Sequence, residues 1–334
     1  MIRLKEILTK KGILLSLVVI VIISLILNIP YLTNNYMLRV INMTMITYIC
    51  VLSLYVLFGM CGQHSFAQAG LWGVGAYITG NVSKLLQLPA IVCILISMVG
   101  TALLAFVLGL VLFRLRKYYF TFSTIGVMMI LFGLFQNWTP VTGGAMGMSD
   151  IPRFSFFGHS LQAEGSYFYL IFIMALLASV AVMLLFRSAL GRSFMAIRDN
   201  EIAADSLGIN SLLTKDIAFA ISGALCGLAG ALFASLAGYI SSATFTYSQS
   251  TMYLVMIMLG GSSTPFGALV GAVILSLMPE WARALKSYMM LIYGVGIMVL
   301  MIVLPEGIVG GGKDLYAKYV EKRKKSRAVA KECQ

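Results

Sequence analysis

Few residues of this chain have the types and spacing that catalysis or metal binding requires. The two histidines, His64 and His159, are far apart in the sequence, and the five cysteines show no C-x-x-C spacing. A lone histidine in an apolar run more often makes a structural hydrogen bond than a metal bond. The apolar runs also hold no Ser/His, His-x-x-x-His or Asp/Asp constellation. We therefore predict no metal site, no catalytic residue and no enzymatic activity.

One glycine-rich segment imitates a nucleotide-binding loop. The stretch 307–313, GIVGGGK, matches the spacing of a phosphate-binding loop as far as its lysine. Asp314 then stands where a Ser or Thr would hold Mg²⁺, and the segment follows an apolar run instead of a parallel strand. We predict that the chain binds no cofactor and no nucleotide.

The composition indicates what kind of element carries the remaining residues. Apolar residues make up 60% of the 334 positions and charged residues 11%, against roughly 25% charged residues in soluble domains. Backbone groups in lipid are satisfied within helices or closed barrels. Long apolar runs favour helices, so we predict an all-α bundle in one transmembrane domain, residues 1–312.

About ten apolar runs are candidate spans, because a helix needs about 20 apolar residues to cross the hydrocarbon. The first run is long for a signal peptide and lacks a small-residue cleavage site, so we interpret it as a retained span. Glycines and a proline within 259–279 leave open a broken or re-entrant segment there. The candidates are 12–29, 37–58, 65–81, 89–113, 118–136, 166–187, 216–237, 248–260, 265–280 and 288–304.

The net charge of +12 is distributed as in a membrane protein. Nineteen of the 24 Lys and Arg residues lie in the N-terminal segment, at 114–117, at 187–215 and in the tail 313–334, where apolar runs stop. The positive-inside rule then places these segments, and both termini, in the cytoplasm. We expect the tail to lie near anionic lipid headgroups, and we predict no nucleic-acid partner.

Two connecting segments are long enough to have a function. The external loop 136–165 contains Thr142, Gly143, Gly144 and Gly147, whose glycines allow turns at positive φ. It is either a solvated connector, or a docking surface for an external partner or a lip over the pore. The cytoplasmic loop 188–215 predicts a short helix, capped by Asp199 or Asn200 and ended by Gly208.

That short cytoplasmic helix has an apolar side. Ile202, Ala203 and Leu207 share one face by helical spacing. The helix is either an ordinary capped surface helix or one that lies in the groove of a soluble partner.

A third region of interest is the glycine-rich stretch that begins at residue 62. A helix can break there and expose backbone groups to a solute. We predict that Gln63, His64, Ser65 and Gln68 line a pathway, although packing is the alternative.

These motifs together resemble a known family. The cytoplasmic loop resembles the coupling loop of ABC-importer permeases, and GQHSFAQAG followed by GVGAY (62–77) resembles a stretch of the branched-chain amino acid permease family, more its LivM type than its LivH type. Asn137–Gly147 and PEGI at 305–308 resemble its external loop and closing motif. His64 and Ala67 depart from the family pattern, which weakens any conclusion about the exact substrate.

The resemblance implies a multi-pass permease of the bacterial cytoplasmic (inner) membrane. It further implies a second homologous permease subunit, separate ABC ATPase subunits that bind the ATP, and an extracytoplasmic substrate-binding protein. The cargo would be branched-chain amino acids. The residues implied to couple to the ATPase are Arg198, Asp199, Asn200, Glu201, Ala203, Ala204, Leu207 and Gly208.

Two alternatives keep the membrane bundle. The first is the same architecture with another cargo, such as urea, a short amide, a simple sugar or a nucleoside. The second is an autonomous ion-coupled carrier, which would more often show charged residues within its spans.

Overall fold

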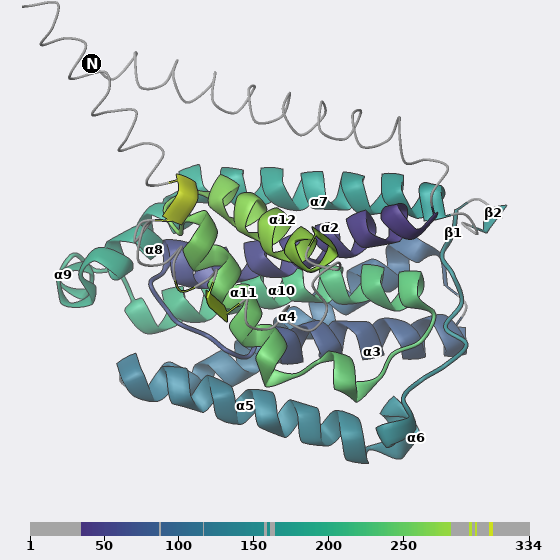
Figure 1. Ribbon diagram of the computed structural model, residues 1–334. Helices are drawn as coiled ribbons and strands as arrows, with labels where there is room; N and C mark the ends of the chain where they lie inside the picture. The colour runs from purple at the N-terminus through teal and green to yellow at the C-terminus, as the bar shows by residue number, and fades with distance from the viewer. Residues whose placement is uncertain are drawn as a thin grey trace, which may run out of the picture.

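The structure is a computed structural model that describes residues 35–86, 88–115, 117–156, 159–160 and 164–281, with residues 294–295, 298 and 307–309. The described part is a bundle of helices (Figure 1). The predicted spans 12–29 and 288–304 lie wholly or mostly outside the described residues, as does the basic tail.

Six long helices build the described part of the bundle. They are α2 (Asn35–Tyr55), α3 (Gln68–Leu86), α4 (Ala90–Leu112), α5 (Lys117–Asn137), α7 (Glu164–Arg187) and α10 (Ser211–Ala237). Shorter elements connect them: η1 (Val56–Met60), α6 (Thr139–Thr142), η2 (Gly144–Met146), β1 (Ser155–Phe156), β2 (His159–Ser160), α8 (Ala189–Asp199), α9 (Glu201–Ser206), η3 (Ser242–Thr244), α11 (Tyr247–Gly260) and α12 (Pro265–Trp281).

The all-α membrane bundle is confirmed, but ten separate spans are not. Among the described residues, five helices are long and apolar enough to cross a membrane, or six if a bent pair counts as one. That pair is 242–260 with 265–279, which bends by 118° at its break. The two spans predicted at 248–260 and 265–280 are therefore the arms of one broken segment.

The helix predicted at 65–81 is also different from a simple span. It corresponds to α3, which does not belong to the five apolar helices. Most of its residues are buried by protein, including Gln68 and Thr79. A helix enclosed by its neighbours does not need a continuous apolar surface, so composition alone overestimates its contact with lipid.

Glycines bring α3, α4 and α10 into close contact. A Cβ on Gly75 would come within 2.7 Å of Gly227 Cα, and one on Gly230 within 2.5 Å of Ala76 N. The Ser97 hydroxyl of α4 lies at this crossing and is within hydrogen-bonding distance of Gly75 O (2.8 Å) and Gly227 O (2.9 Å). Small residues thus allow the backbones to approach.

The two functional segments lie at opposite ends of the bundle. Figure 1 shows α8 and α9 at one end and α6, β1 and β2 at the other. Helices α5 and α7 run between these ends. The predicted cytoplasmic and external loops are therefore separated by the length of the spans.

The chain is not helical between η1 and α3. Gly62 has φ +70°, and its neighbours use unusual partners: Gln63 N donates to Leu57 O at 2.9 Å and Phe66 N to Thr124 Oγ1 at 3.1 Å. Because non-helical backbone inside a membrane protein needs such protein partners, this break is a built feature of the fold.

Candidate functional site: the α8–α9 helix pair

The predicted cytoplasmic loop is largely helical. Ser188 caps α8, because its hydroxyl accepts a hydrogen bond from Gly191 N at 3.1 Å. Helix α8 ends where Asn200 adopts extended geometry, with φ −159° and ψ 109°. The same residue then caps α9, its Oδ1 accepting from Ala203 N at 3.1 Å. Sequence reasoning predicted α9 and its cap but not α8.

Helix α9 ends as the sequence predicts. Gly208 has φ +84°, a left-handed conformation that favours glycine. Asp205 then connects the end of α9 to α10 by accepting from Ser211 N at 3.2 Å. Asn210 caps α10 through Leu213 N at 3.1 Å. Local capping chemistry therefore fixes the turn between the two helices.

The short helix presents apolar side chains to solvent. Ile202 is 80% exposed and Leu207 82% exposed, whereas Ala204 is buried. Helix α9 itself lies at one end of the bundle (Figure 1). Exposed apolar residues that cluster on one small element are typical of a surface that a partner covers.

Two further polar contacts attach this helix pair to the membrane bundle. Arg198, at the end of α8, donates from Nη1 to Gly59 O in η1 at 2.7 Å. Lys215 of α10, whose side chain is only 8% exposed, forms an ion pair with Glu201 of α9. These contacts connect α8 to η1 and α9 to α10.

The residues predicted to couple to an ATPase are thus brought together but differ in position. Arg198, Asn200, Glu201 and Gly208 hold the helix pair in place, and Ala204 packs inward. Asp199 forms an exposed ion pair with Arg198 at 3.3 Å, and Ala203 and Leu207 are exposed.

Sequence reasoning missed two residues of this arrangement, Gly59 and Lys215. The signal available for Lys215 was a basic residue at the start of an apolar span. No local pattern marks the Gly59 carbonyl as an acceptor.

The residues predicted to line a pathway have different surroundings. Ser65 and Gln68 are fully buried, Gln63 is 7% exposed and His64 is exposed. Gln68 is held at a helix crossing, where its Nε2 donates to Ser222 Oγ at 3.2 Å and its Oε1 accepts from Cys226 Sγ at 3.0 Å. His64 contacts Phe58 edge to face, with ring centroids 4.7 Å apart.

Comparison with known proteins identifies the kind of bundle this is. The family model for the branched-chain amino acid transport system / permease component matches residues 36–304, which is most of the chain. The chain belongs to this permease family. Its members are transport proteins, not enzymes.

Named relatives agree with this assignment. The high-affinity branched-chain amino acid transport system permease protein LivM of Salmonella typhimurium is 32% identical over 303 residues, covering 84% of this chain and 71% of LivM. LivM of Escherichia coli K12 gives the same values. The autoinducer 2 import system permease protein LsrC of Salmonella paratyphi B is 30% identical over 162 residues, covering 46% of this chain and 44% of LsrC. No solved structure matches the chain.

In this permease, the glycines predicted to serve external docking shape the loop. Gly143 and Gly147 both have φ +75°, and a Cβ on Gly147 would lie 2.3 Å from Ile240 O. Thr142 is buried, and its hydroxyl donates to Phe135 O at 2.8 Å and accepts from Gly144 N at 3.1 Å. These four residues form the turn itself.

A β-bridge fixes this loop to the segment that follows α10 and leads to α11. Met148 N donates to Ile240 O at 2.8 Å, and Ile240 N donates back to Met148 O at 2.9 Å. Tyr239 Oη donates to Met146 O at 2.8 Å. The exposed surface beside this bridge consists of Met146, 86% exposed, and Tyr239, 48% exposed.

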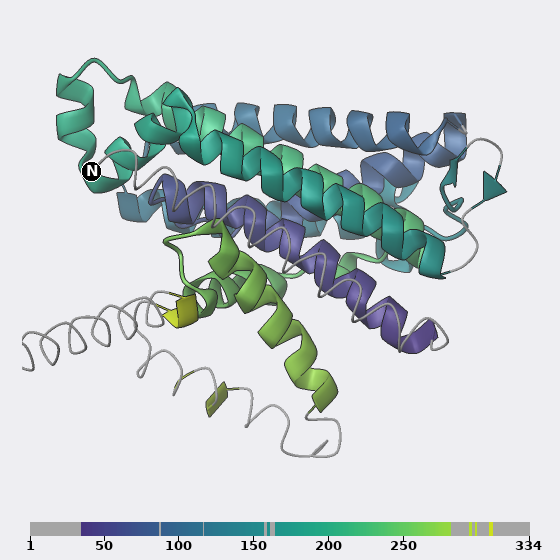
Figure 2. The same ribbon diagram turned by 90° about the horizontal axis from the view of Figure 1, so that it is seen from above.

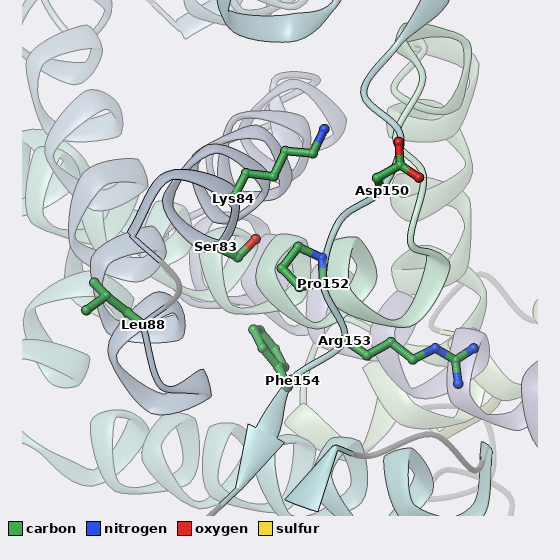
Figure 3. A pocket seen from close by; sticks show the side chains of 7 residues that line it. All are labelled: Ser83, Lys84, Leu88, Asp150, Pro152, Arg153 and Phe154. Atoms are coloured by element: carbon green, nitrogen blue, oxygen red, sulfur yellow. The ribbon is translucent and has the colours of Figure 1, made fainter. Parts of the chain in front are cut away.

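A polar cavity of ≈ 400 Å³ lies under the same loop of the permease. Figure 3 shows Lys84, at the end of α3, extending toward the segment that carries Asp150, while Arg153 points away from it. Asp150 has φ +56°, rare for a residue other than glycine. The cavity mixes both signs of charge and favours no single ligand class.

Proposed function

We propose that this chain is the membrane-spanning permease subunit of an ABC importer that moves branched-chain amino acids inward. A second homologous permease subunit would complete the channel, and separate ATPase subunits would bind and hydrolyse the ATP. An extracytoplasmic binding protein would deliver the solute. Both termini would lie in the cytoplasm.

The observation that carries this proposal is helix α9. It presents exposed Ile202 and Leu207 beyond the spans, and Glu201 connects it to α10 through Lys215. A helix with apolar side chains exposed and its base held by an ion pair suits docking into the groove of a soluble protein. ATPase closure would then move the helix and the spans attached to it.

The external loop suits docking of the extracytoplasmic binding protein. Thr142, Gly143, Gly144 and Gly147 would hold the loop in shape, and Met146 with Tyr239 would supply the contact surface. Methionine and tyrosine are enriched in protein interfaces. The non-helical break at 61–67 contains Gln63, His64 and Ser65 and is followed by Gln68. In the same mechanism, this break would move when Arg198 moves, because Arg198 donates a hydrogen bond to Gly59 O.

The test is substrate-stimulated ATP hydrolysis by the complete transporter in proteoliposomes. Leucine, isoleucine or valine, presented with the binding protein, is expected to raise turnover. Ile202→Asp/Leu207→Asp is expected to abolish association with the ATPase, because a charge would be buried at the contact. Ile202→Leu/Leu207→Met, which keeps the apolar surface, serves as the matched control.

The other outcomes assign the remaining alternatives. Stimulation only by urea, an amide, a sugar or a nucleoside would keep the importer and replace the cargo. Normal uptake by the Asp variant with no ATPase bound would make the chain an autonomous carrier, and the importer proposal would be wrong.

A further inference from the structure

A cavity separate from the predicted pathway residues lies along one face of α2. It has a volume of ≈ 380 Å³ and is lined by α2, α11 and α12. Its α2 residues include Arg39, Val40, Met43 and Thr47, which recur at helical spacing on a single face. Figure 2 shows α2, in purple, lying between α7 and α12.

The lining of this cavity changes character along α2. Arg39 lies near the beginning of α2, which is the external end in the proposed orientation. Val40 and Met43 follow as apolar neighbours. Further hydroxyl and amide groups come from Thr47, Gln249 and Ser276. No acidic residue lines it among the described residues.

Polar groups on this face need an explanation at membrane depth. Thr47, Gln249 and Ser276 belong to helices that lie within the membrane domain, and such groups usually face a cavity or another helix. The Arg39 guanidinium forms no ion pair with any described residue. An arginine without a carboxylate partner beside an apolar wall leaves its five N–H donors available to a ligand.

We infer that this cavity is a solute site for a small aliphatic amino acid. Arg39 binds the carboxylate as the solute enters, because guanidinium and carboxylate pair through two parallel hydrogen bonds. Val40, Met43 and Met256 contact the hydrocarbon side chain, and the neutral oxygens of Thr47 and Gln249 accept hydrogen bonds from the ammonium group. The inference rests on the proposed function and adds the position of the solute.

The four described cysteines are buried, and the fifth, Cys333, is replaced by serine for a labelling test. Ser276→Cys, at a lining position that is assigned no contact with the solute, would be placed in the assembled transporter, in phosphatidylcholine liposomes, and treated with a membrane-impermeant maleimide. Leucine is expected to slow labelling by about tenfold. Arg39→Gln in the same background is expected to raise the leucine concentration needed for protection by roughly 10- to 100-fold, as for loss of a charge-assisted hydrogen bond.

Controls separate the carboxylate contact from a general charge effect. Lys84→Gln removes one exposed positive charge at the same end of the molecule, outside this cavity, and is expected to leave protection unchanged. Leucinamide, which lacks the carboxylate, is expected to protect poorly. Equal protection by leucine and leucinamide would overturn the assignment of Arg39.

The remaining outcomes distinguish the site from the proposed function. Protection by added anionic lipid but not by leucine would assign the cavity to lipid headgroups and overturn the inference. Leucine uptake is measured in the same vesicles. Normal uptake without protection would reject this site alone, whereas absent uptake of every branched-chain amino acid would reject the proposed function.

Discussion

Arg198 Nη1 lies 2.7 Å from the carbonyl oxygen of Gly59. This hydrogen bond joins the last turn of α8 directly to η1, the π-helical end of the α2 span. The two residues are separated by 139 positions in the chain. Gly62, three residues after Gly59, also contacts Arg198, since a Cβ there would lie 2.8 Å from Arg198 Cγ. The α8–α9 helix pair and the end of the α2–η1 span thus meet at one side chain.

Replacing Arg198 tests whether this contact transmits movement. Arg198→Met keeps much of the side-chain volume but removes the donor to Gly59 O. We expect the transporter to assemble with its ATPase and to lose most substrate-stimulated hydrolysis, while basal hydrolysis continues. Asp199→Asn, which removes only the exposed ion pair, is the matched control. Equal stimulation in wild type and Arg198→Met would show that the contact is only structural.

The Glu201–Lys215 pair predicts an asymmetric mutational effect. Glu201→Gln leaves the nearly buried Lys215 ammonium without its anion, and we expect a loss of about 1–3 kcal/mol of stability. Lys215→Met leaves Glu201, whose side chain is 45% exposed, able to reach water, so its cost is expected to be smaller. Thermal unfolding of the purified complex measures both. Equal, negligible shifts would mean that the pair behaves as an exposed ion pair.

Gly208 offers a test of helix termination. Gly208 has φ +84°, a conformation in which alanine is expected to cost about 1–2 kcal/mol of local conformational free energy. We expect Gly208→Ala to weaken ATPase binding several-fold, because Leu207 would be displaced. Asparagine tolerates the left-handed region better, so Gly208→Asn is expected to lie between wild type and Ala. Titration of the ATPase subunit against the solubilised permease gives the affinities. Unchanged affinity in the Ala variant would exclude a role for this turn.

Glycines of the bundle differ in how closely the Cβ of an introduced alanine would approach neighbouring atoms. Gly230→Ala places a Cβ 2.5 Å from Trp72 O, and overpacking of this kind costs about 1–3 kcal/mol. Gly126 and Gly133 of α5 have nothing within 4 Å of such a Cβ, so alanine there is expected to raise helix stability by up to about 1 kcal/mol. Midpoints of thermal unfolding should separate the two classes. Similar shifts at Gly230 and Gly126 would contradict the close approach of α3 and α10.

Much of the fold follows from apolar length, because a run of about 20 apolar residues has few alternatives to a span. The ends of α9 were predictable for a different reason. Asn200 and Gly208 act within a few residues of their own backbone, so the sequence contains the whole cause.

Features that depend on distant partners were not predictable in the same way. The buried amide of Gln68 forms hydrogen bonds with Ser222 and Cys226 of α10, and no local pattern indicates these partners. The bend between α11 and α12 was left open, because glycine and proline permit a break without fixing its angle. A carbonyl acceptor such as Gly59 O has no side-chain signature at all.

The crossing of α3, α4 and α10 also determines how the protein deforms. The Ser97 hydroxyl joins Gly75 and Gly227 where no side chains separate the helices, so the three helices resist sliding past one another. Among the described helices, we therefore expect a force applied at Arg198 to shift the bent α11–α12 pair against this block before it distorts the block itself.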